Sequence, residues 1–167
     1  MWSDSNIRFP PGRFKAELAS SYTGLVPWAS FTAAPGTGKI DDVTATRPPR
    51  GSVLLVEDEV MIRMMVADML KELGYTIAAE AGEIGEAMRL AETTFFDLAI
   101  LDVNVNGKVI SPVADLLKAR NRPFIFATGY GFSGLPEEYR DRPSIQKPFQ
   151  IEILDRIIDS VLRNSKA

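Results

Sequence analysis

The chain of 167 residues contains neither cysteine nor histidine. Without cysteine there are no disulfides, thiolate metal ligands or cysteine nucleophiles. Without histidine there are no imidazole zinc sites, Ser-His-Asp triads or histidine acid–base catalysts. Any proton or phosphoryl transfer must therefore use carboxylates, lysine and hydroxyl groups, or a histidine that another protein supplies.

The sequence also lacks a strong net charge, a secretory signal and a long apolar run. The formal net charge is -3, which is too small to indicate binding to nucleic acid or to a membrane surface. No basic stretch followed by an apolar core opens the chain, and its apolar runs are far shorter than the ~20 residues of a membrane helix. We expect a cytoplasmic protein without membrane insertion.

Composition divides the chain near residue 50. Residues 1–50 hold six of the eleven prolines, and their apolar residues keep no helical or alternating period for more than a turn or two. This pattern predicts a flexible extension over 1–50 that ends in the stiff segment Arg47-Pro48-Pro49-Arg50. The aromatic residues of the extension leave a docking segment as the alternative. Residues 51–167 are long enough for one domain.

From residue 52 onwards, short apolar runs alternate with helical spacing. The runs predict strands over 53–56, 75–79, 98–101, 124–127 and 144–146. The spacing predicts one helix through Met61, Met64 and Met65 that stops at Gly74, one from Ile84 to Ala91, one with Ser111 as N-cap and Pro112 as first residue, and one from Ile151 to Leu162. Alternating strands and helices predict an α/β fold, a five-stranded parallel sheet with helices on both faces. Glycines and prolines in 131–143 predict an atypical fourth helix.

Polar side chains follow the ends of these predicted strands. Glu57 and Asp58 follow the first strand, Asp102 ends the third, Thr128 ends the fourth, and Lys147 follows the fifth. Ligands of open α/β sheets bind outside the carboxyl ends of the strands. Each residue alone could be a helix cap or a turn residue, but their joint placement on one edge indicates a site.

The charges of these residues indicate the chemistry. Glu57, Asp58 and Asp102 would repel one another if they converged without compensation. A divalent cation together with Lys147 would balance them, and hard carboxylate oxygens suit Mg²⁺. A carboxylate beside such a cation can attack phosphorus. The lysine and the Thr128 hydroxyl could then contact the transferring group.

Four segments together resemble the receiver domain of two-component response regulators. They are Val53-Leu54-Leu55-Val56-Glu57-Asp58-Glu59, Asp97-Leu98-Ala99-Ile100-Leu101-Asp102-Val103-Asn104, Phe126-Ala127-Thr128-Gly129-Tyr130 and Gln146-Lys147-Pro148-Phe149. The resemblance covers about residues 52–164. It implies a flavodoxin-like sheet of strand order 2-1-3-4-5.

The resemblance also implies a role for each site residue. Asp102 would accept the phosphoryl group, and Mg²⁺ would be held by Glu57, Asp58, Asp102 and the backbone carbonyl of Asn104. Thr128 would be the switch hydroxyl. Lys147 would bind the acyl phosphate, and in the family its bond to the following proline is usually cis.

Three features depart from the common pattern. Ser144 stands where receivers usually have an aromatic residue, and Val105-Asn106-Gly107 replaces the usual hydrophobic-Pro pair. The segment Phe126-Ala127-Thr128-Gly129-Tyr130 resembles a subgroup of stand-alone receivers from alphaproteobacteria, whose fourth helix is atypical. Phosphorylation is still expected, whereas the usual aromatic switch and dimer face are not.

The sequence therefore predicts a single-domain response regulator that is phosphorylated on Asp102 by a partner histidine kinase or histidine phosphotransfer protein. Such a protein catalyses its own phosphotransfer and dephosphorylation without being a classical enzyme. No DNA-binding domain is expected after the last helix, so output would pass to a downstream protein target, or the chain would act as a phosphate sink.

Two alternatives stay open at the level of sequence. An aspartate-nucleophile phosphatase uses a similar site, but its motif follows the first strand, whereas Asp102-Val103-Asn104-Val105 follows the third. A pseudo-receiver would be an interaction scaffold without phosphotransfer. Its usual signature is the loss of an acidic, acceptor or lysine position, and none is lost here.

Overall fold

The computed structural model describes residues 7–8, 49–130 and 134–165. The extension predicted over 1–50 lies outside these ranges, apart from residues 7–8 and 49–50. Within the described ranges, no helix is both long enough and apolar enough to cross a membrane.

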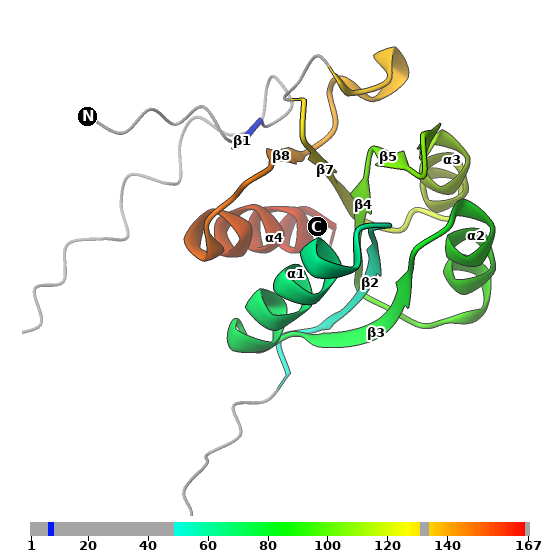
Figure 1. Ribbon diagram of the computed structural model, residues 1–167. Helices are drawn as coiled ribbons and strands as arrows, with labels where there is room; N and C mark the ends of the chain where they lie inside the picture. The colour runs from blue at the N-terminus through cyan, green and yellow to red at the C-terminus, as the bar shows by residue number, and fades with distance from the viewer. Residues whose placement is uncertain (1–6, 9–48, 131–133, 166–167) are drawn as a thin grey trace, which may run out of the picture.

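A six-stranded sheet forms the centre of the fold (Figure 1). Its strands are β1 (Ile7–Arg8), β2 (Ser52–Val56), β3 (Thr76–Ala81), β4 (Leu98–Asp102), β7 (Phe124–Thr128) and β8 (Ser144–Gln146). They lie in the order β1-β8-β7-β4-β2-β3. The five strands of this sheet other than β1 are mutually parallel and lie in the order β3-β2-β4-β7-β8, which confirms the predicted order 2-1-3-4-5. The sequence did not predict β1, which pairs antiparallel with the edge strand β8.

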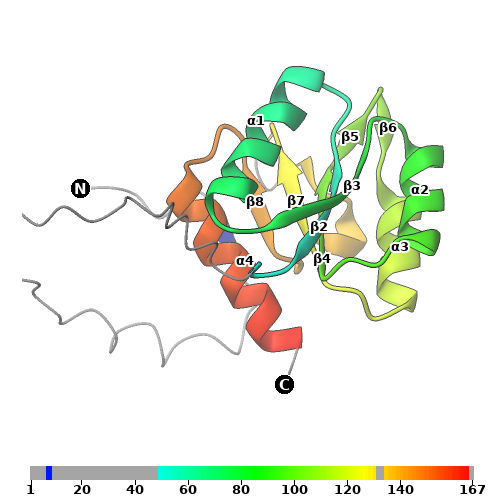
Figure 2. The ribbon, with the colours of Figure 1, turned by 90° about the horizontal axis from the view of Figure 1, so that it is seen from below.

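Helices cover both faces of the sheet (Figures 1 and 2). They are α1 (Val60–Glu72), α2 (Ile84–Thr93), α3 (Ser111–Ala119) and α4 (Ile151–Ser165). Because successive strand residues point to opposite faces, each central strand contributes to two cores. Val53 and Leu55 of β2 pack with α1 and α4, whereas Leu54 and Val56 pack with α2 and α3. A strand buried on both faces explains the apolar runs of the sequence.

Helix α1 occurs where predicted, but Met61, Met64 and Met65, the methionines that predicted it, do not form its buried face. Met61 is 78% exposed and Met64 is 56% exposed, while the residues that pack on the sheet are Val66, Ala67 and Leu70. The predicted stop at Gly74 is confirmed by its left-handed backbone, with φ of 88°.

The predicted cap of α3 is wrong by one residue. Ile110 occupies the N-cap position, and Ser111 is already the first residue of the helix. The backbone of Ile110 donates to the carbonyl of Val103 at 3.0 Å, and the Ile110 side chain is fully buried. Tertiary packing of this side chain therefore sets where α3 begins, in place of a side-chain cap.

The segment between β7 and β8 is irregular, as predicted. Its described part contains the short 3-10 helix η2 (Glu137–Tyr139). The Tyr139 ring is fully buried, lies 5.4 Å from the Phe126 ring centre, and its hydroxyl donates to Asp115 of α3. In β8, the hydroxyl of Ser144 is buried and has no hydrogen-bond partner among the described residues. A buried aromatic from the loop thus fixes this segment, and no ring occupies position 144.

Candidate functional site

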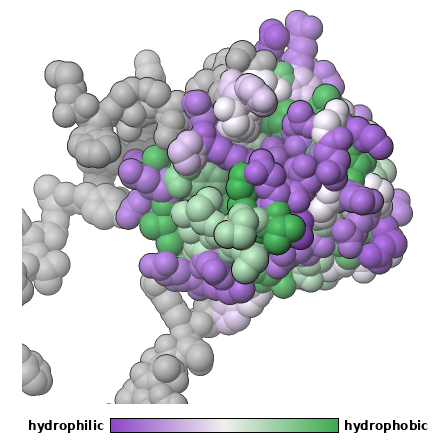
Figure 3. Space-filling model, viewed as in Figure 1, coloured by the Kyte–Doolittle hydropathy of each residue, from purple (hydrophilic) through white to green (hydrophobic). Residues whose placement is uncertain are grey.

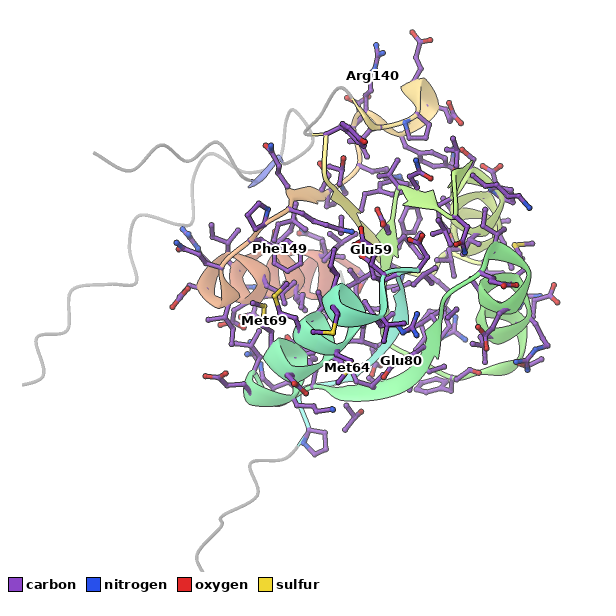
Figure 4. All side chains as sticks on the ribbon, in the orientation of Figure 1. Glu59, Met64, Met69, Glu80, Arg140 and Phe149 are labelled. Carbon is purple, nitrogen blue, oxygen red and sulfur yellow. The ribbon has the colours of Figure 1, made fainter. Side chains whose placement is uncertain are left out.

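The predicted site residues meet at the carboxyl ends of the parallel strands. The register aligns Val56 with Leu101, so Glu57 and Asp58 emerge beside Asp102. One oxygen from each of these three carboxylates lies within 4.8 Å of the others. We call this group of Glu57, Asp58 and Asp102 the acidic rim. Figure 4 shows the neighbouring Glu59 at the beginning of α1.

Lys147 lies between two of the carboxylates. Its Nζ is 3.0 Å from Asp102 Oδ2 and makes a second ion pair with Glu57 Oε2. The Lys147 side chain is 14% exposed and that of Glu57 only 3%. The three carboxylates and the one ammonium sum to a formal charge of -2, and water screens the buried Glu57 and Asp102 poorly, whereas Asp58 is half-buried. The Lys147–Pro148 bond is cis.

Burial and pairing shift the pKa values of this pair. Burial raises the pKa of Glu57, and the hydrogen bond from Lys147 opposes that rise without cancelling it. Burial would lower the pKa of Lys147, but its hydrogen bonds to Glu57 and Asp102 outweigh burial and raise it. The lysine is therefore a permanent cation near neutral pH, and excess negative charge is stored on the carboxylates.

Thr128 ends β7 on the same edge and is 1% exposed. Its Oγ1 accepts a hydrogen bond from the backbone of Tyr130 at 3.1 Å. A Cβ added to Gly134 would lie 3.0 Å from this oxygen, so glycine allows the loop to approach the hydroxyl closely. The structure therefore places the Thr128 hydroxyl where a change in its direction would reach residues 130 and 134.

Two residues that the sequence analysis missed hold the backbone of the site. Arg63 of α1 donates to the Glu57 carbonyl at 2.6 Å and pairs with Glu80 at 3.3 Å. Asn106 lies in an unpredicted hairpin of β5 (Asn104–Val105) and β6 (Lys108–Val109). The Asn-Gly dipeptide at 106–107 is a strong hairpin signal and could have revealed it. Arg63 had no comparable signal, because its partners are fixed only by the tertiary fold.

An open pocket of about 810 Å³ lies over the acidic rim, and Asp58, Asp102, Thr128 and Lys147 contribute to its lining. The donor set fits a hard divalent cation, since three carboxylate oxygens converge from two adjacent strands. Asn104 lies two residues after Asp102, and its backbone nitrogen is 3.4 Å from Asp102 Oδ1. The arrangement can hold a cation beside a carboxylate that is accessible from the pocket.

Residues 53–131 match the family described as response regulator receiver domain. The transcriptional regulatory protein PdtaR of Mycobacterium tuberculosis is 38% identical over 122 residues, which are 71% of this chain and 58% of PdtaR. This chain therefore spans little more than half the length of that curated relative.

Solved structures agree with this match. The solution structure of SdrG from Sphingomonas melonis is 38% identical, covers 66% of this chain and 95% of SdrG, and superposes with a TM-score of 0.61. The receiver domain of PhyR from Erythrobacter litoralis is 28% identical, with coverage of 69% and 92% and a TM-score of 0.61. The chain belongs to the response regulator receiver family.

Proposed function

We propose that this receiver accepts a phosphoryl group on Asp102 from a partner histidine kinase or histidine phosphotransfer protein. One observation carries the proposal. Asp102 lies beneath an open pocket, is paired with Lys147 at 3.0 Å, and converges with two further carboxylates. This is an excess of negative charge around a nucleophile, which a bound divalent cation would relieve, and the same cation would offset the negative charge that an incoming phosphoryl group adds.

The proposed transfer gives different roles to the acidic rim, to Lys147 and to Thr128. An Asp102 carboxylate oxygen forms a bond to phosphorus as the P–N bond of a phosphohistidine breaks, and the leaving imidazole takes up a proton from water. Lys147 is already beside Asp102. It then moves from the carboxylate towards an oxygen of the new phosphoryl group. The Thr128 hydroxyl donates to a second phosphoryl oxygen. Mg²⁺ held by Glu57, Asp58, Asp102 and the Asn104 carbonyl would neutralise charge on the transferring group.

An exposed apolar surface beside the pocket supports a protein partner as the donor. Four large apolar side chains of α1 are between 43% and 78% exposed: Val60, Met61, Met64 and Met65. Figure 3 shows apolar side chains gathered over this region, and Figure 4 labels Met64 on α1. Methionine adapts its shape to a partner surface, and the chain has no histidine of its own.

For output, we propose contact with a downstream protein or draining of phosphate from a shared kinase in the cytoplasm. The resemblance to related receivers supports protein contact. A PhyR that is 25% identical is described as an anti-anti-sigma factor, and SdrG has a structure described as a BeF3-activated conformation. A change at Thr128 would pass to Tyr130 through their hydrogen bond.

Labelling with radioactive acetyl phosphate tests the proposal. Wild-type protein should be labelled in the presence of Mg²⁺, and Asp102→Asn should fall to background because the amide is not a nucleophile. Asp68→Asn is the matched control, since Asp68 is exposed on α1 and is not among the residues that line the pocket. Unlabelled wild-type protein would support an interaction scaffold without phosphotransfer. Equal labelling of Asp102→Asn would place the acceptor elsewhere.

A further inference from the structure

The connection after β4 folds into a two-residue hairpin loop at the mouth of the pocket. Its two loop residues, Asn106 and Gly107, have φ angles of 52° and 76°. Positive φ at both positions is the signature of a type I′ turn, which asparagine followed by glycine favours. The base of the hairpin is fixed, since Val105 is buried in the core and the backbone of Ile110 donates to the Val103 carbonyl.

The tip of this hairpin is tied to the ends of two other strands. The backbone N–H of Asn106 donates to Asp58 Oδ2 at 3.0 Å. The side-chain amide of Asn106 donates to the Gly82 carbonyl at 2.9 Å. Residue 58 follows β2 and residue 82 follows β3. One asparagine therefore joins three loops, and one of its bonds ends on a carboxylate of the acidic rim.

The three carboxylates of the acidic rim are held in two different ways. Lys147 pairs with Glu57 and with Asp102. Among the residues that the structure describes, Asp58 has no ion pair within 4.0 Å and is held by the neutral N–H of Asn106. A neutral donor fixes the direction of a carboxylate without neutralising it, so Asp58 keeps its charge for a cation.

We propose that Asn106 is a positioning residue, which orients the Asp58 carboxylate for divalent-cation binding. This inference rests on the magnesium site of the proposed function. The physical reason is entropy: an ordered side chain loses less rotamer freedom when the cation binds. The side-chain bond to Gly82 keeps the Asn106 N–H in place, and the N–H keeps one oxygen of Asp58 in place. The other oxygen can then face the cation.

Asn106→Gly isolates this role. Glycine adopts positive φ without strain and retains the backbone N–H, so the turn survives and only the bond to Gly82 is lost. Asn121→Gly is the matched control. Asn121 has nearly the same φ of 53°, follows α3, and its backbone donates to the Lys118 carbonyl, far from the acidic rim along the chain. Both variants change asparagine to glycine in the same backbone conformation.

Calorimetric titration of the full chain with MgCl₂ tests the inference. We expect Asn106→Gly to raise the Kd for Mg²⁺ about 3- to 10-fold, the size of one lost hydrogen bond, and Asn121→Gly to match wild type. The Mg²⁺ concentration for half-maximal acetyl phosphate labelling should rise by the same factor, and saturating Mg²⁺ should restore labelling.

The possible contrary results are distinguishable. An unchanged or lower Kd in Asn106→Gly, with wild type binding Mg²⁺ normally, would overturn the positioning role and leave the proposed function intact. A fall in melting temperature of the metal-free variant without any change in Kd would make Asn106 a turn residue only. Wild-type protein that binds no Mg²⁺ would overturn the magnesium site and the positioning role together.

Discussion

The acidic rim and the opposite rim of the same sheet both place a cation between carboxylates, but they do so in different surroundings. At the opposite rim, Arg50 pairs with Asp155 at 2.6 Å and Asp159 at 2.5 Å, two residues one turn apart on α4. Its guanidinium also lies 4.9 Å from the centre of the Tyr75 ring, and the Tyr75 hydroxyl contacts Asp159 at 3.3 Å. We call these four residues the arginine clasp.

The two clusters differ in burial and in charge balance. In the clasp, one guanidinium faces two carboxylates, and the ion-paired side chains are 24% to 40% exposed, so water screens the remaining charge. At the acidic rim, the Lys147 ammonium pairs with two of the three carboxylates, and the paired side chains are 3% to 14% exposed. The clasp joins parts of the fold, whereas the acidic rim keeps an unbalanced charge at the expense of stability, as functional sites often do.

The arginine and the tyrosine of the clasp do not titrate near neutral pH. Burial raises the pKa of Tyr75 to about 12. Burial would lower the pKa of Arg50, but its hydrogen bond to Asp155 and the nearby negative charges raise it. Neither group changes its charge between pH 5 and pH 9. In the acidic rim, by contrast, the raised pKa of Glu57 brings its titration closer to neutral pH.

The largest effect should come from removing Lys147, the cation that pairs with two carboxylates of the acidic rim. We expect Lys147→Met to lower the free energy of unfolding of metal-free protein by about 3 kcal/mol at pH 7, because buried carboxylates lose their partner. In this variant, the pKa of Glu57 in the folded state rises further above its value in the unfolded state, because the hydrogen bond from Lys147 no longer opposes the effect of burial. The folded state binds more protons as the pH falls from 7 to 5, so the variant should regain stability over that range.

Urea denaturation of Lys147→Met at pH 5 and pH 7 measures both effects. Lys71→Met is the control, since Lys71 is exposed and forms an ion pair with Asp68, three residues away on α1. If Lys147→Met were as stable as wild type at both pH values, the carboxylates would not depend on this lysine, and the contrast with the clasp would disappear.

Breaking the clasp should have a smaller effect. We expect Arg50→Met to lower the free energy of unfolding by about 1–2 kcal/mol, the sum of partly exposed ion pairs and one cation–π contact. The loss should shrink in high salt, which screens exposed charges. Arg156→Met is the control, because Arg156 is exposed on the same helix. A loss as large as that of Lys147→Met, or one independent of salt, would contradict the comparison.

The comparison also shows what could be predicted from the sequence. The carboxyl ends of parallel strands share one edge, so the placement of Glu57, Asp102 and Lys147 at one edge could be predicted from the ends of the predicted strands. The arginine clasp did not follow, because Arg50 precedes the first predicted strand and its carboxylate partners lie on α4, whose packing against the sheet no strand pattern predicts. The sequence pattern therefore predicted only that Arg50 ends a linker.

Helix faces and turn contacts were harder to predict for different reasons. Spacing predicted α1 but could not show that Met61 faces outward, because several registers of that helix have an apolar stripe and packing on the sheet selects one. The role of Asn106 depended on a hairpin whose tip reaches Gly82. Such contacts depend on the relative positions of three loops, which no local pattern encodes.

Removing negative charge should have opposite effects at the two rims. We expect the double variant Glu57→Gln and Asp58→Asn to gain about 1 kcal/mol in metal-free protein, since repulsion around Asp102 is relieved, and to lose Mg²⁺ binding. The matched double variant Asp155→Asn and Asp159→Asn should instead lose stability. Urea denaturation with and without Mg²⁺ measures both. If both double variants changed the free energy of unfolding in the same direction, the two clusters would not differ in charge balance.

The smallest effect should come from the chain that precedes Arg50. We propose that residues 1–50 are an extension of the receiver domain, whose described residues before Arg50 add β1 to the edge of β8, with Ile7 opposite Ile145. Deleting residues 1–48 keeps Arg50 and the clasp. Because a two-residue strand contributes few hydrogen bonds, we expect a loss below about 1 kcal/mol and unchanged labelling of Asp102. Urea denaturation and acetyl phosphate labelling of the shortened chain measure these quantities. A loss of several kcal/mol would show instead that the extension docks on the receiver, and the folded unit would then begin well before Arg50.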